Sequence, residues 1–103
     1  MNERELWDTM EKALKPIARR SREDAEDVYR CLCNTAWVPV EGIEGWTWGD
    51  PGIYLSWRSA GAFVAGLRGE GEDYMDFYCS GKEGTITREI RETLEKKGLR
   101  PLT

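Results

Sequence analysis

The segment from Trp46 to Cys79 constrains the fold most, because apolar and polar residues alternate along it and glycines interrupt it. It carries three of the five tryptophans and three of the four tyrosines. Alternation with a period of two residues is typical of a half-buried β-strand, and short glycine turns favour antiparallel neighbours. We expect an antiparallel meander with strands over residues 53–59, 62–68 and 73–79.

Apolar residues at helical spacing predict two helices before this meander and one after it. The first begins at Asn2, and Pro16 predicts that it ends or kinks near Leu14, because proline removes a backbone donor. The second covers residues 22–33 and the last covers residues 87–97. The fold class is therefore α+β: two N-terminal helices, an antiparallel meander of three to four strands and a C-terminal helix.

Local signals mark the ends of these elements. Ser21 followed by Asp24 resembles a capping box for the second helix. Thr85 or Thr87 caps the last helix, and Gly98 ends it. A short extended run at residues 37–40 contains a proline, which confines it to an edge or a strand end.

Length and composition restrict the class of protein. With 103 residues, the chain is expected to be a single domain over residues 1–103. No apolar run approaches the roughly 20 residues that span a bilayer, and the acidic N-terminus is unlike a signal peptide, so a cytoplasmic location without a membrane partner is expected. Three cysteines and no histidine argue against a disulfide framework, a metal site or a cofactor, and against an enzyme.

The charge is unevenly distributed. The net charge is −4, residues 41–76 are acidic, and residues 12–22 are basic. An acidic chain disfavours direct contact with nucleic acid, which needs phosphate neutralisation, and favours a protein partner with a basic surface. We interpret residues 12–22 as a solvated connector in preference to a phosphate-contacting patch.

The meander predicts one apolar face and one face rich in tyrosine and charge. Tyrosine and arginine are enriched at the centres of protein interfaces. The alternative is that these side chains only pair across strands or are covered by a helix. The candidate partner-binding residues are Tyr54, Arg58, Tyr74, Asp76 and Tyr78 on the face, with Glu70, Glu72 and Asp73 in the adjoining loop.

The run from Gly52 to Arg58, together with Tyr74-Met75-Asp76-Phe77-Tyr78, resembles a Gly-x-x-Leu-x-Trp strand in the meander of small bacterial and phage α+β proteins. This resemblance implies a fold and not an activity. Size and acidity are also similar to those of phage-encoded inhibitors of host defence, such as anti-CRISPR proteins. We expect a non-enzymatic inhibitor that occupies a basic, nucleic-acid-binding surface of a host complex. The alternatives are an immunity protein or antitoxin for a basic toxin, and a structural protein that self-associates as a homodimer.

Overall fold

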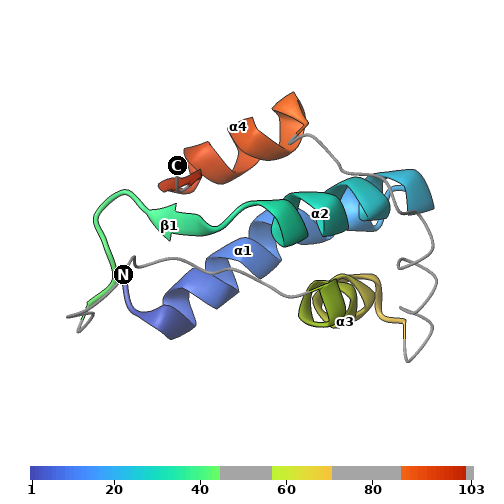
Figure 1. Cartoon of the computed structure of the whole chain (residues 1–103), viewed down its shortest axis with the longest axis horizontal. Coiled ribbons are helices and arrows are strands. Elements are labelled where there is room, and N and C mark those ends of the chain that lie inside the picture. The colour runs from blue at the N-terminus through green and yellow to red at the C-terminus, as the bar shows by residue number, and fades with distance from the viewer. Residues whose placement is uncertain (45–56, 71–86, 102–103) are drawn as a thin grey trace.

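The computed structural model describes residues 1–44, 57–70 and 87–101 (Figure 1). Helix α1 contacts each of the other three helices in the described part of the chain, and a short sheet lies beside α4. The elements, in chain order, are α1 (Glu3–Ala18), α2 (Arg22–Asn34), β1 (Trp37–Pro39), α3 (Trp57–Arg68), α4 (Arg88–Lys96) and β2 (Leu99–Pro101).

Helix α1 runs further than the sequence predicts. The Asn2 side chain accepts a hydrogen bond from the Glu5 backbone N–H at 2.8 Å, which confirms the predicted start. The helix then continues through Pro16 to Ala18, so of the two predicted outcomes, an end or a kink near Leu14, the end is wrong. Proline has no N–H, so the Lys12 carbonyl four residues earlier has no amide donor. Pro16 and Lys12 are both exposed, so this carbonyl lies on the solvent side of the helix. Burial of Ile17 and Ala18 beyond the proline offsets this loss.

The predictions for α2 and α4 are confirmed. The Ser21 hydroxyl accepts the Asp24 backbone N–H at 3.0 Å, and the Thr87 hydroxyl accepts that of Ile90 at 3.3 Å. Both bonds satisfy backbone donors that have no partner within the first turn of a helix. Gly98, with φ +83°, ends α4 in a conformation that favours glycine.

The region predicted to form the middle strand of the meander is a helix. Residues 57–68 form α3, so the strand over 62–68 and the end of the strand over 53–59 are wrong. Ala60, Val64 and Leu67 recur at helical spacing, and all three are buried. Apart from Phe63, the residues between them are alanine and glycine, so the same run is also compatible with a period of two residues. Residues 53–56 and 73–79 lie outside the described residues.

The extended run at residues 37–40 does form a strand, but its partner is the C-terminal end of the chain. β1 pairs antiparallel with β2, with Val38 opposite Arg100. The Val40 N–H donates to the Gly98 carbonyl at 2.8 Å and extends the pairing by one residue. The described fold is thus mainly helical with a two-stranded sheet, which keeps α+β as the coarse class.

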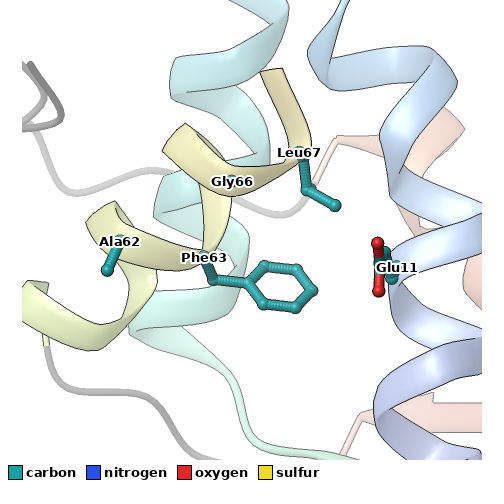
Figure 2. Close-up of a pocket in the computed structure, with 5 residues that line it drawn as sticks. All are labelled: Glu11, Ala62, Phe63, Gly66 and Leu67. Carbon is teal, nitrogen blue, oxygen red and sulfur yellow. The ribbon is translucent and has the colours of Figure 1, made fainter. Parts of the chain in front are cut away.

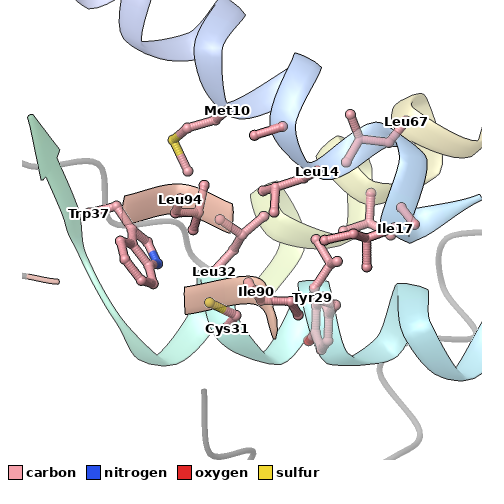
Figure 3. Close-up of a cluster of buried hydrophobic side chains, with 14 of the residues drawn as sticks. Met10, Leu14, Ile17, Tyr29, Cys31, Leu32, Trp37, Leu67, Ile90 and Leu94 are labelled. Atoms are coloured by element: carbon pink, nitrogen blue, oxygen red, sulfur yellow. The ribbon is translucent and has the colours of Figure 1, made fainter. Parts of the chain in front are cut away.

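One hydrophobic core joins these elements. Figure 3 shows side chains from all four helices and β1 meeting around Leu14 and Leu32. The Trp37 indole is fully buried between the sheet and the helices. In residues 1–44, 59–70 and 87–101, the buried set contains no charged side chain.

Candidate functional site

The described residues include only part of the predicted partner-binding face. Tyr54, Glu72, Asp73, Tyr74, Asp76 and Tyr78 lie outside the described residues. Arg58 belongs to the first turn of α3, so its predicted place on a strand face beside Tyr54 is wrong. Glu70 directly follows α3 and pairs with Arg68 at 2.7 Å. The ion pair therefore joins Glu70, the first residue of the predicted acidic loop, to the last residue of α3.

Arg68 joins the end of α3 to the turn between α1 and α2. One of its terminal nitrogens donates to the carbonyls of Ala18 and Ser21, at 2.8 and 2.9 Å. These carbonyls lie where α1 ends and α2 begins. The last carbonyls of a helix lack intrahelical partners and carry partial negative charge, so a guanidinium is a favourable donor to the one at Ala18. The side chain is 20% exposed, which limits competition by water.

Arg19 makes the reciprocal contact. Its Nε donates to the Leu67 carbonyl at 2.6 Å, in the last turn of α3. Another of its nitrogens would lie 3.6 Å from a Cβ built on Gly69, so the side chain packs along the chain as it leaves α3. Each of the two helix ends is thus held by an arginine from the other.

Arg20 joins the same turn to the start of α4. Its guanidinium makes two hydrogen bonds to the Glu89 carboxylate, at 2.6 and 3.0 Å, and a third to Asp24 at 3.1 Å. The bond from Arg20 lowers the pKa of Glu89, and the two carboxylates raise the pKa of Arg20. The fork geometry of arginine suits this paired contact.

We call Arg19, Arg20 and Arg68 the arginine corner. Arg68 pairs with Glu70 and Arg20 pairs with Glu89, so the described residues on both sides of residues 71–86 are joined to this corner. The interpretation of residues 12–22 as a connector was incomplete. Two of their cations hold other elements in place, and no signal in the local sequence identifies partners that are 48 and 69 residues away.

The intervening residues 71–86 carry most of the excess negative charge. Of the 15 basic and 19 acidic residues, one basic (Lys82) and five acidic residues lie in 45–56 and 71–86. The described residues therefore hold 14 of each sign and no net charge, and the net charge of −4 comes entirely from those two segments. The five acids are Asp50, Glu72, Asp73, Asp76 and Glu83.

A second surface feature is a hollow of about 220 Å³ between α1 and α3 (Figure 2). Its lining residues are Glu11, Ala62, Phe63, Gly66 and Leu67. The Phe63 ring also contacts the Trp7 ring, with centroids 5.6 Å apart and planes inclined at 49°. Phe63 lies within the predicted middle strand, over residues 62–68, but it belongs to α3 and is only partly buried.

The cysteines described by the structure are poor nucleophiles. Burial raises the pKa of Cys31 to about 12, and burial also raises the pKa of Cys33. A thiol must ionise to attack or to bind a metal, so neither residue is activated. Across residues 1–44, 57–70 and 87–101, we find no group of three acidic, cysteine or histidine side chains able to hold a metal ion. Among the helices of these same ranges, none has the length and apolar character needed to cross a membrane.

Comparison with protein-family models, curated proteins and solved structures finds no match.

Proposed function

We propose that this protein is a non-enzymatic inhibitor that binds a protein partner through the acidic, tyrosine-containing residues 70–78. The observation that carries the proposal is the separation of charge. The described body is neutral, and the excess acid lies in segments 45–56 and 71–86. Clustered acid on an otherwise balanced protein steers it toward basic surfaces.

The arginine corner supports this proposal. Arg68 and Arg20 hold the two points between which residues 71–86 run, and both contacts are charge-assisted. Fixing the ends of an interaction segment reduces the conformational entropy that binding must remove. Tyr74 and Tyr78 would add apolar area with a polar tip to the acids between them.

A basic protein surface of this kind commonly serves to bind nucleic acid. An acidic segment with interspersed aromatic rings would compete for that surface, since it offers both charge and stacking area. The specific form of the proposal is an anti-defence protein of the anti-CRISPR kind, which occupies a nucleic-acid-binding surface of a host complex.

The experiment is affinity capture from a bacterial lysate with three baits. They are the wild-type protein, the variant Glu72→Lys/Asp73→Lys/Asp76→Lys, and a control variant Glu3→Lys/Asp8→Lys/Glu41→Lys. Both variants change the net charge equally. The control acids are exposed and make no ion pair within the described ranges. Circular dichroism first establishes that each bait is folded.

We expect the wild-type and control baits to capture the same basic protein and the segment variant to lose it by about tenfold or more. A further variant, Tyr54→Ala/Tyr78→Ala, should also weaken capture. Equal capture by all of the baits, or capture of no protein with a basic surface, would overturn the proposal.

A further inference from the structure

Two of the four α3 residues that line the hollow between α1 and α3 are small, Ala62 and Gly66, and they leave it open. Gly66 lies on its wall, and a Cβ built there meets no atom within 4 Å. Ala62, one turn earlier, is exposed. Figure 2 shows Phe63 and Leu67 extending from α3 toward α1, with Glu11 on the opposite side. The hollow therefore has an apolar wall and an acidic wall.

The apolar wall is fixed by packing. Leu67 is 2% exposed, and the Phe63 ring is backed by the Trp7 ring. Trp7 and Glu11 are four residues apart on α1, so they lie on the same edge of that helix, next to its buried stripe. The aromatic pair thus stands beside the carboxylate, which is an arrangement suited to a cation with an apolar stem.

Glu11 has no ion partner in the part of the chain that the structure describes, although six of the other helix acids there are paired. Lys15 lies one turn further along α1 and does not approach Glu11 within 4.0 Å. The carboxylate is exposed, so it remains hydrated while the hollow is unfilled. An incoming cation would replace part of that hydration with an ion pair.

We propose that this hollow binds the side chain of an arginine or lysine from the partner protein. The cationic group pairs with Glu11, and the aliphatic stem lies against Phe63 and Leu67. The inference rests on the proposed function for the basic chemistry of the partner. It adds a contact made by residues of α1 and α3, in which one carboxylate, that of Glu11, pairs with one cationic side chain.

The test uses N-acetyl-L-arginine methylamide as a probe, titrated into the full chain and followed by amide chemical shifts. N-acetyl-L-norleucine methylamide is the matched probe without charge. We expect saturable shifts at Glu11, Phe63, Gly66 and Leu67 with the arginine probe and much smaller shifts with norleucine. Because no partner protein is needed, this result is independent of the outcome of affinity capture.

Three variants separate the possible causes. Glu11→Gln should weaken binding of the arginine probe about fivefold. Gly66→Leu should abolish binding by filling the hollow while the spectrum stays folded. Glu41→Gln, the same change at an exposed site away from the hollow, should leave binding unchanged. Equal binding of both probes, or an unchanged affinity in Glu11→Gln, would overturn the inference. Shifts at Phe63 that depend on protein concentration alone would also overturn it and would indicate a second copy of the chain as the occupant.

Discussion

Arg19 and Arg68 each hold the carboxyl-terminal end of the other's helix. The Arg19 Nε donates to Leu67 at 2.6 Å, and Arg68 donates to Ala18 at 2.8 Å. The contacts join residues that are 48 and 50 positions apart in the chain. This pairing fixes α3 against α1 at the corner where the acidic residues begin.

Replacing Arg68 tests this arrangement. Arg68→Ala leaves the Ala18 carbonyl without its cationic donor and frees Glu70. We expect the free energy of unfolding to fall by about 2–3 kcal/mol, because hydrogen bonds from charged donors in a partly buried site are involved. Urea denaturation monitored by tryptophan fluorescence measures the change.

The matched control is Arg88→Ala. Among the described residues, the ion partner of Arg88 is Glu92, four residues along α4, and the Arg88 side chain is 91% exposed. We expect a change within about 0.5 kcal/mol. Equal losses in Arg68→Ala and Arg88→Ala would show that the reciprocal contact is not structural.

The pair between Arg20 and Glu89 predicts a pH dependence. The hydrogen bond from Arg20 lowers the pKa of Glu89 below its ordinary value of 4.5. A carboxyl whose pKa is depressed in the folded state contributes stability above its unfolded pKa. That contribution is lost as the pH falls through the folded pKa. We therefore expect Glu89→Gln to be less stable than the wild type at neutral pH and equally stable in acid. Thermal unfolding of both proteins from neutral pH into acid measures the difference in stability between Glu89→Gln and the wild type.

Salt provides the control for this prediction. Both side chains are about half exposed, at 46% and 55%, so added salt should reduce the difference between wild type and variant. A constant difference from neutral pH into acid would contradict the role assigned to Glu89.

The elements with local signals could be predicted from the sequence, and the contacts between distant residues could not. Ser21 and Gly98 mark the limits of α2 and α4 through bonds to near neighbours. Alanine and glycine make up much of α3, and they are neither strongly polar nor strongly apolar. The hydrophobic pattern there fits both the two-residue period of a strand and the 3.6-residue period of a helix. The pairing of β1 with β2 joins residues more than 50 positions apart, and no turn sequence links them.

Pro16 gives a prediction of increased stability. It lies inside α1 and is exposed, so replacement by alanine restores a backbone hydrogen bond and removes little packing. The free energy gained from this hydrogen bond exceeds the stabilisation that proline provides by reducing the conformational entropy of the unfolded chain. We expect Pro16→Ala to raise the free energy of unfolding by about 1–2 kcal/mol. The control Lys12→Ala, at an exposed site of the same helix, should change it by about 0.5 kcal/mol or less. A loss of stability in Pro16→Ala would contradict this account of α1.

Thiol labelling tests the burial of Cys31. Its side chain is 1% exposed and its pKa is raised to about 12, so on the order of one molecule in 10⁴ carries the thiolate at pH 8. In a Cys79→Ser background, we expect iodoacetamide to modify Cys33 well before Cys31. In urea the two should react at similar rates. Peptide mapping by mass spectrometry distinguishes the two modified cysteines. Equal rates of modification in the native protein would contradict the burial of Cys31 in the hydrophobic core.

In the proposed function, the acidic residues after α3 occupy a basic surface that otherwise binds nucleic acid. The most direct measurement is fluorescence anisotropy of a labelled nucleic acid bound to the captured partner, with the protein added as competitor. The account predicts that the wild type and the Glu3→Lys/Asp8→Lys/Glu41→Lys control displace the nucleic acid, and that Glu72→Lys/Asp73→Lys/Asp76→Lys does not. Displacement by all three proteins alike, or by none of them, would contradict it.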